Sequence, residues 1–317
     1  GQKEAMEHAG RTGGLPFVGV GWYRTEFDVP QFQAGKRATI LFDGAMSHAN
    51  VYINGQKVGY WPYGYNSFHF DITKYLKPGE KNTLAVRLEN LPESSRWYPG
   101  AGLYRNVHLI ITEDAYIPVW GTYITTPSVN EKFAKVNVRT KVVLPEGADP
   151  AKYSVETSVW NPNKQKLTAV RTSLAQMKYN NNQAEQEFVI QAPSLWSPEM
   201  PALYSAETRL YEGDKLKDIY TTPFGIRSIE IIPDKGFFLN GKRTVFKGVC
   251  NHHDLGPLGA AVNDAAIRRQ IRILKDMGCN AIRTSHNMPA PELIRACDEM
   301  GMMIMAESFD EWNVAKC

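Results

Sequence analysis

Three short apolar runs near the C-terminal end of the chain are each followed directly by polar and charged side chains. These polar segments are residues 250–254, 283–287 and 307–312, and helix-like segments separate them. A β/α barrel places its active site at the carboxyl ends of successive parallel strands. The pattern therefore predicts one wall of an active site, and the chain reaches only the third such strand end before Cys317.

The hydrophobic periodicity between these segments predicts strands and helices in alternation. Asn263 or Asp264 is expected to cap a helix that ends at Gly278, and Pro291 is expected to open a second helix that ends at Gly301. The strands are expected at residues 244–249, 279–284 and 302–306. Alternating strands and helices with short links predict a parallel sheet, although three units do not distinguish a barrel from an open sheet.

Two all-β regions precede this part. Residues 22–111 contain strand-like runs at 38–42, 50–53, 56–60, 68–72 and 83–88, with the hairpin pair Asn54-Gly55, and predict a sandwich of jelly-roll type. Residues 115–228 alternate like half-buried strands at 133–143, 154–160, 185–190, 204–211 and 219–224, which fits an immunoglobulin-like sandwich. The predicted domains are therefore 1–113, 114–228 and 229–317.

Composition excludes several classes of protein. The net charge is +3 without a dense basic block, which argues against nucleic-acid binding, and no apolar run approaches the roughly 20 residues that span a bilayer. The four cysteines, all in the last predicted domain, are interpreted as free thiols, so they do not decide the compartment. The start at Gly1, without Met or signal sequence, is interpreted as a processed, engineered or truncated end.

Arg283 and His286 form the most specific cluster of candidate ligand-binding residues. They follow a buried strand three residues apart, with Asn287 beside them. Planar guanidinium and imidazole groups can orient several hydroxyls at once, which suits a hydroxyl-rich ligand. The alternative is that Arg283 pairs with a barrel carboxylate and His286 caps the next loop.

The adjacent residues His252 and His253 follow the first strand of this part. Neighbouring side chains on extended backbone point in opposite directions, so the two rarely share one metal ion, and no second cluster at zinc spacing exists. We therefore expect no metal and no cofactor, while the sequence does not decide cation dependence. Asp254, oriented by one of the histidines, and His252 are candidate sugar contacts.

The third polar segment contains Glu307, Asp310 and Glu311. Two carboxylates about 5 Å apart carry out retaining glycoside hydrolysis, but one sequence does not show that these residues form such a pair. Ligand contacts and a salt bridge at the barrel mouth are the alternative that we favour. Trp312 could be a platform for a sugar ring or could simply pack.

Aromatic residues also gather in loops of the first domain. They include Trp61 and Trp97. One interpretation is that they pack against a neighbouring domain, and the other is that Trp61 and Trp97 line the pocket.

Several of these segments resemble glycoside hydrolase family 2. They are GVCNHHD at 248–254 with the helix after it, NAIRTSHN at 280–287, CDEMG at 297–301 and SRWYPGAGLYRNV at 95–107. The domain order is also similar, and the resemblance covers nearly the whole chain. The HHDLG stretch at 252–256 is most similar to the β-galactosidase branch, whereas β-glucuronidases and β-mannosidases share the RTSH type of segment.

The resemblance implies a retaining mechanism with two glutamates, a general acid/base after the fourth barrel strand and a nucleophile after the seventh, both beyond Cys317. No catalytic group is therefore expected in this chain. The resemblance implies that His286 contacts the sugar and supports it in the transition state, that Arg283 is a barrel arginine, and that Glu307 is non-catalytic.

These observations together predict an exo-β-galactosidase that acts on terminal β-galactosides, of which this chain holds the substrate-binding part. The alternatives are a β-glucuronidase or β-mannosidase, a non-catalytic carbohydrate-binding module, and a structural fragment. The expected partner is a carbohydrate, not nucleic acid or membrane, and the full-length protein is expected to be a homo-oligomer. A periplasmic or secreted location is expected from the family, with a cytoplasmic one left open.

Overall fold

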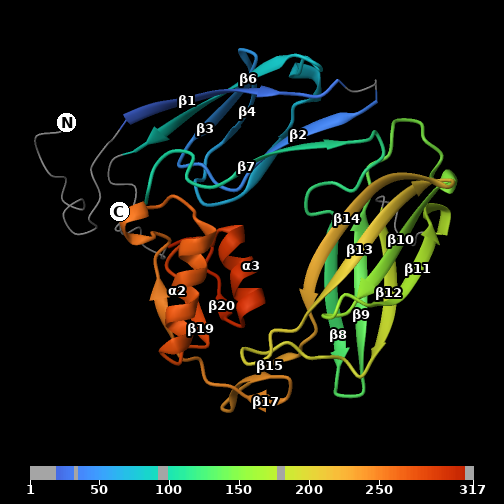
Figure 1. Cartoon of the computed structure of the whole chain (residues 1–317), viewed down its shortest axis with the longest axis vertical. Coiled ribbons are helices and arrows are strands. Elements are labelled where there is room, and N and C mark those ends of the chain that lie inside the picture. Colours follow the sequence, from blue (N-terminus) through green and yellow to red (C-terminus); the bar gives the residue numbers. More distant parts are fainter. Residues whose placement is uncertain (1–18, 32–34, 92–98, 177–182, 311–317) are drawn as a thin grey trace, which may run out of the picture. The chain divides into compact units, whose positions relative to one another are not determined.

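A computed structural model of the chain describes residues 19–31, 35–91, 99–176 and 183–310. These residues form two compact units. The first unit combines the residues up to Ile111 with Gly248–Cys297 and the segment from Met302, and the second contains Thr112–Lys247 and Asp298–Gly301. The architecture is multidomain and β-rich, with one sandwich in each unit and the first strands and helices of a barrel (Figure 1).

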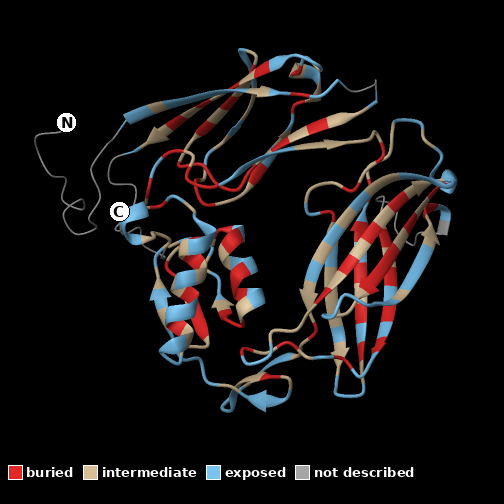
Figure 2. Ribbon diagram, in the orientation of Figure 1, coloured by how far each residue is buried: buried red, intermediate tan, exposed pale blue. Residues whose placement is uncertain are grey.

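The sandwich of the first unit has two layers. One layer is the sheet β1(Gly19–Asp28)–β6(Lys81–Asn90)–β3(Ala49–Ile53)–β4(Gln56–Trp61), and the other is β5(Phe68–Asp71)–β2(Arg37–Phe42)–β7(Val107–Thr112). Residues along β3 and β2 alternate between buried and partly exposed, so each layer turns its apolar face inward (Figure 2). The predicted hairpin is confirmed, since Asn54 and Gly55 join β3 to β4 with φ values of 50° and 80°.

The second unit is the immunoglobulin-like sandwich. Its sheets are β11(Lys166–Ser173)–β10(Tyr153–Trp160)–β13(Leu203–Glu212)–β14(Lys215–Gly225) and β12(Gln183–Gln191)–β9(Phe133–Lys141)–β8(Thr122–Val129). Our sequence interpretation missed β8 and β11. Both lie at sheet edges, and in β11 the apolar side chains Leu167 and Val170 are exposed, so the alternation that marks a half-buried strand is weak there.

The same unit ends in a small antiparallel sheet, β15(Ile229–Ile232)–β16(Gly236–Leu239)–β17(Lys242–Arg243). The expected strand at 244–249 is wrong in its start, because β18 runs only from Gly248 to Asn251. Phe246 packs instead against Phe237 of the small sheet, with ring centroids 4.7 Å apart. Short 3-10 helices occur at Thr73–Tyr75, Pro150–Lys152, Leu174–Gln176 and Gly256–Leu258.

The barrel segment is a three-stranded parallel sheet with helices between its strands. The order along the chain is β18(Gly248–Asn251), α2(Asp264–Asp276), β19(Ala281–Thr284), α3(Pro291–Met300) and β20(Met303–Met305), and the sheet order is β18–β19–β20. Gly248 allows β18 to approach β19 closely, because a Cβ at this position would lie 1.9 Å from the carbonyl oxygen of Ala281.

The helix boundaries follow from their caps. The side chain of Asn263 accepts a hydrogen bond of 3.0 Å from the backbone N–H of Ala266, which confirms the predicted cap of α2. Ile267, Ile271 and Leu274 form the buried stripe of this helix. Gly278 has a φ of 86°, as a residue that ends a helix needs. In the described part of the chain, no helix is both long and apolar enough to cross a membrane.

Candidate functional site

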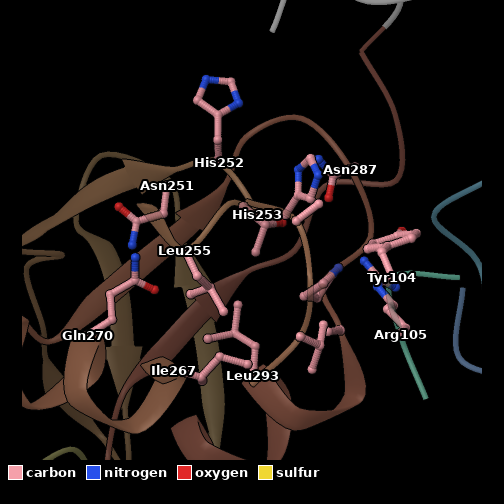
Figure 3. Close-up of a pocket in the computed structure, with 15 residues that line it drawn as sticks. Tyr104, Arg105, Asn251, His252, His253, Leu255, Ile267, Gln270, Asn287 and Leu293 are labelled. Atoms are coloured by element: carbon pink, nitrogen blue, oxygen red, sulfur yellow. The ribbon is translucent and has the colours of Figure 1, made fainter. Parts of the chain in front are cut away.

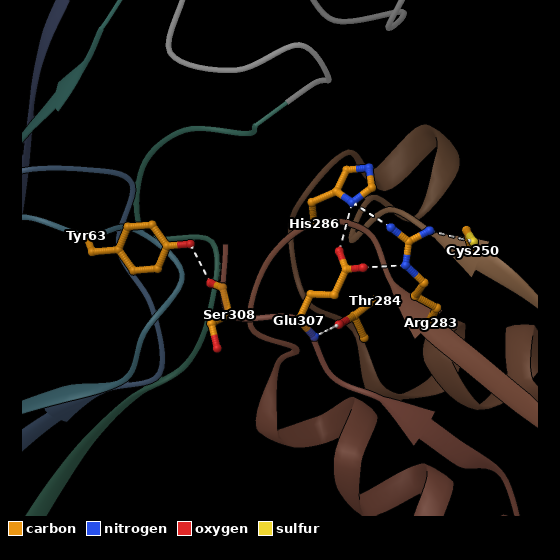
Figure 4. Close-up of polar contacts among 7 residues, drawn as sticks. All are labelled: Tyr63, Cys250, Arg283, Thr284, His286, Glu307 and Ser308. Atoms are coloured by element: carbon orange, nitrogen blue, oxygen red, sulfur yellow. Dashed lines mark hydrogen bonds and ion pairs between the residues drawn. The ribbon is translucent and has the colours of Figure 1, made fainter. Parts of the chain in front are cut away.

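Arg283, His286 and Glu307 form one polar network at the carboxyl ends of β19 and β20 (Figure 4). Nε of Arg283 donates a hydrogen bond to Oε1 of Glu307, and Nδ1 of His286 lies 2.8 Å from Oε2 of the same carboxylate. Nη1 of Arg283 also donates to Sγ of Cys250 at 3.2 Å. The fold thus brings Arg283, His286 and Glu307 together from two β/α units, at neighbouring strand ends.

The sheet register explains how the network assembles. Arg283 pairs with Cys250 of β18 on one side and with Met305 of β20 on the other, so it lies on the central strand of the sheet. Its neighbours Ile282 and Thr284 are buried and anchor β19. The backbone N–H of Glu307 donates to Oγ1 of Thr284 at 3.0 Å, which holds the carboxylate beside the end of β19.

The contacts of Nδ1 assign the proton of His286. This nitrogen lies 2.8 Å from Oε2 of Glu307 and 3.2 Å from Nη2 of Arg283. A carboxylate only accepts, so the shorter contact places the proton on Nδ1, and the guanidinium then lies beside the ring without donating to that nitrogen. The contact with Glu307 uses Nδ1 and does not involve Nε2.

Partial burial acts to raise the pKa of Glu307, but hydrogen bonds from Arg283 and His286 and their charges outweigh it, so the pKa is lowered overall. The hydrogen bond to Glu307 raises the pKa of Arg283. Glu307 is thus an anion at neutral pH, and Arg283 balances its charge. A general acid needs a raised pKa, so Glu307 is suited to positioning its neighbours rather than to donating a proton.

His252 and His253 point to different environments, as the extended backbone predicted. His252 is exposed, its ring meets that of His286 edge-on at 5.7 Å, and desolvation together with the nearby His286 lowers its pKa. Figure 3 shows its ring pointing away from the other labelled side chains. His253 is largely buried against Tyr65 and donates from Nε2 to the carbonyl of Pro99 at 3.0 Å. The described residues contain no cluster of three or more His, Cys, Asp and Glu that could hold a metal ion.

Asn287 is 1 % exposed and lines a small cavity of about 40 Å³ together with His253, Gln270 and Leu293 (Figure 3). Its side chain is buried in the wall of this cavity. A direct substrate contact, as predicted for Asn287, would require this buried amide to be reached. In the described part of the chain, the buried amide nitrogen of Asn287 has no hydrogen-bond partner.

The remaining predicted contacts divide into two groups. Asp254 lies in a depression of about 310 Å³ that adjoins this cavity through Gln270 of α2, and it does not join the network. Asp310 is partly exposed three residues after Glu307. Trp97 and Trp312 lie outside the described residues.

The aromatic loops of the first domain give a mixed result. Trp61 stacks on Phe68 at 5.6 Å and packs against the sandwich core, so the interpretation that it lines the pocket is wrong. Tyr63, two residues later, donates from its hydroxyl to the carbonyl of Ser308 at 2.8 Å, directly beside Glu307 (Figure 4). Successive residues of β4 point to opposite faces of the sheet, so Trp61, the last residue of the strand, points to the sandwich core.

Sequence reasoning missed Arg105, which joins the first sandwich to the barrel segment. This residue is 5 % exposed, and its guanidinium donates to the carbonyls of Asp43, Tyr65 and Met288 at 3.2, 2.8 and 2.7 Å. The adjacent Asn106 donates to Glu292 of α3 at 2.5 Å. Both residues lie in the family-like segment 95–107, but their contacts could not be predicted, because the acceptors come from distant segments of the chain.

Comparison with protein families gives three matches along the chain. The sugar binding domain of glycosyl hydrolases family 2 matches residues 16–113, the family 2 model itself matches residues 116–227, and the family 2 TIM barrel domain matches residues 230–314. The three matches follow one another in the order of the sandwiches and the barrel segment described above.

Individual relatives agree with these matches. A β-galactosidase of Bacteroides ovatus is 45% identical over 98% of this chain and 37% of its own length, and a β-glucuronidase of Bacteroides fragilis is 33% identical over 91% of this chain and 43% of its own length. A crystal structure of a β-glycosidase from Bacteroides vulgatus superimposes with a TM-score of 0.89 at 35% identity and covers 99% of this chain and 40% of that one. The chain thus spans less than half the length of these relatives.

Proposed function

Because the chain belongs to glycoside hydrolase family 2, we propose that it is the substrate-holding part of a retaining exo-β-galactosidase that hydrolyses terminal β-galactosides. The observation that carries this proposal is the Arg283–His286–Glu307 network at the carboxyl ends of two parallel strands. The β-galactosidase of Bacteroides ovatus, at 45% identity, supports the choice of galactoside.

In this proposal His286 contacts the sugar, and Glu307 positions the imidazole of His286. Glu307 holds Nδ1–H of the imidazole, so the ring keeps one orientation and Nε2 meets a hydroxyl of the glycon. Such a contact accelerates the reaction only if it is stronger in the transition state than in the bound substrate. The general acid/base and the nucleophile are assigned to later barrel strands, so the 317-residue chain by itself is expected to show no turnover.

A β-glucuronidase is the second candidate, because the Bacteroides fragilis relative carries that name. A glucuronide brings a carboxylate and needs a cation that is free to pair with it. The guanidinium of Arg283 is already bonded to Glu307, and the Glu307 carboxylate would repel a second anion nearby. The electrostatics of the described residues therefore favour a neutral glycon.

Substrate profiling of the full-length protein tests the proposal. The 4-nitrophenyl β-galactoside, β-glucuronide and β-mannoside are compared by kcat/KM, and the galactoside is expected to exceed the others by at least about a hundredfold. Higher kcat/KM for the glucuronide would replace the galactosidase by the second candidate. Turnover by the 317-residue chain alone would refute the assignment of the catalytic groups.

The carbohydrate substrate is the only partner that the network calls for. A homo-oligomeric full-length protein in the periplasm or outside the cell remains part of the proposal. Sedimentation of the full-length protein and fractionation of cells that produce it test these two points.

A further inference from the structure

The outer face of the sheet β1–β6–β3–β4 carries exposed aromatic side chains on the side opposite the sandwich core. The strand register aligns Trp22, Arg87, Asn50 and Tyr60 in one row that crosses all four strands. Trp22 is 57% exposed and Tyr60 is 46% exposed. Large aromatic groups left in water at both ends of one row are a feature that the fold does not need for its own stability.

A third ring extends this surface. Tyr52 of β3 approaches Trp22 of β1 across the intervening strand β6, with ring centroids 5.6 Å apart and planes inclined by 37°. Ala85 of β6 lies between them. It pairs with Tyr52 on one side and with Arg24, two residues after Trp22, on the other. Its small side chain leaves room for the two rings to meet above the sheet. The result is a continuous aromatic platform at one end of the row.

The polar groups of this face are held in place by one another. Nδ1 of His48 lies 2.7 Å from the Tyr60 hydroxyl, and Nδ2 of Asn50 donates to the carbonyl of His48 at 3.1 Å. Arg87 forms an ion pair with Glu89 of the same strand. The charges of Arg87 and Glu89 therefore balance each other, and Arg24, which pairs with Ala85 on the same face, adds one exposed guanidinium beside the Trp22 platform.

This arrangement fits a sugar better than other partners. A pyranose ring has an apolar face that stacks on aromatic rings, and its hydroxyls suit planar groups such as guanidinium, amide and carboxylate. A nucleic acid needs several positive charges along its backbone, which the balanced Arg87–Glu89 pair and the single guanidinium of Arg24 do not supply. A protein interface usually has a contiguous apolar centre, whereas polar side chains separate Tyr60 from the Trp22 platform here.

The length of the row points to a chain of sugars. Trp22 and Tyr60 lie three strand spacings apart, which is about 14 Å, and this distance is wider than one hexose ring. We propose that the outer face formed by Trp22, Tyr52, Tyr60, His48, Asn50 and Arg87 binds a neutral oligosaccharide chain at a site separate from the Arg283–His286–Glu307 network. Such a site holds a polysaccharide beside the enzyme and raises its local concentration.

Binding of a soluble galactan to the full-length protein tests this site by affinity gel electrophoresis and calorimetry, with polygalacturonate as the anionic comparison. We expect the galactan to retard the protein and the anionic polymer to have no effect. Trp22→Ala combined with Tyr60→Ala is expected to weaken galactan binding at least about tenfold, because each lost stacking contact costs severalfold. Trp22→Tyr keeps a ring and is expected to retain most of the binding.

Trp120→Ala is the matched control, since Trp120 is 56% exposed but belongs to the second sandwich. The readout is binding, so it stays valid whatever glycoside the enzyme hydrolyses. Unchanged galactan binding by the double variant would overturn the proposal, as would an absence of binding by the parent protein. A change in sedimentation of the double variant without loss of binding would assign the face to a second copy of the chain instead.

Discussion

Nδ1 of His286 donates a hydrogen bond of 2.8 Å to Oε2 of Glu307, a residue from the next β/α unit. The carboxylate also accepts from Arg283, so a single anion fixes the direction of both candidate ligand-binding groups. A ring held in this way loses little freedom when a sugar binds, which is the advantage of a site that is formed in advance.

Replacing Glu307 by Gln should lower kcat/KM of the full-length protein about 10- to 100-fold. The amide keeps the size of the side chain but removes the charge that orients His286 and Arg283, and a hydrogen bond to a charged group contributes about 1.5–3 kcal/mol. Initial rates across the pH range provide the measurement, because a positioning role also moves the pH profile. Glu299→Gln, on an exposed part of α3, is the control and should leave the rate unchanged.

His253 should make stability depend on pH in the weakly acidic range. Burial and the nearby charge of Arg105 lower its pKa from 6.5 to about 4, so the unfolded chain binds a proton at a pH where the folded protein does not. Between these two values the unfolded state holds more protons, so the free energy of unfolding falls as the pH falls, by at most about 3 kcal/mol.

Urea titrations of the parent protein and of His253→Gln at pH 7 and pH 4.5 measure this effect. The difference between the two pH values should shrink in the variant. The lowered pKa of Glu307 acts below its ordinary value of 4.5 and so contributes little in this window. An equal loss of stability in both proteins would show that His253 is not responsible.

Replacing Arg105 by Ala should destabilise the first unit by about 3 kcal/mol or more. Three backbone carbonyls, of Asp43, Tyr65 and Met288, would lose their donor in a buried environment. Hydrogen exchange should become faster on both the sandwich side and the α3 side. Arg37→Ala breaks an exposed pair with Asp71 and should cost less than about 1 kcal/mol.

Replacing Trp61 by Ala should lower stability without changing KM. The indole stacks on Phe68 in the sandwich core, and truncation of a core aromatic costs about 3–5 kcal/mol when the residue is fully buried, so a somewhat smaller loss is expected here. Thermal melts and KM for the β-galactoside are measured together. A raised KM with unchanged stability would contradict this prediction and show that Trp61 lines the pocket.

Helix ends and hairpin turns could be predicted well because their signals are local. The cap at Asn263, the helix end at Gly278 and the Asn54-Gly55 turn depend on the conformations of neighbouring residues, and the structure confirms each of them. Edge strands such as β8 and β11 could not be recognised, since their side chains are not sorted between a buried and an exposed face.

The site could be predicted only to the level of its strand ends. Arg283, His286 and Glu307 follow buried strands, and parallel strands bring such ends together whatever the details of packing. Their roles depended on distances. The sequence left open whether Arg283 pairs with a carboxylate or faces a ligand, and the structure shows the pairing with Glu307.

The amino-acid sequence by itself determined the domain types, the family resemblance and the positions of the polar strand ends, because turn residues, caps and hydrophobic periodicity act over a few residues. Only the tertiary structure decided which side chains meet. It directed Trp61 into the core and Tyr63 to the barrel segment, buried Asn287, and placed Arg105 against three distant carbonyls. These contacts join residues far apart in the chain, and their geometry depends on how whole sheets and helices pack.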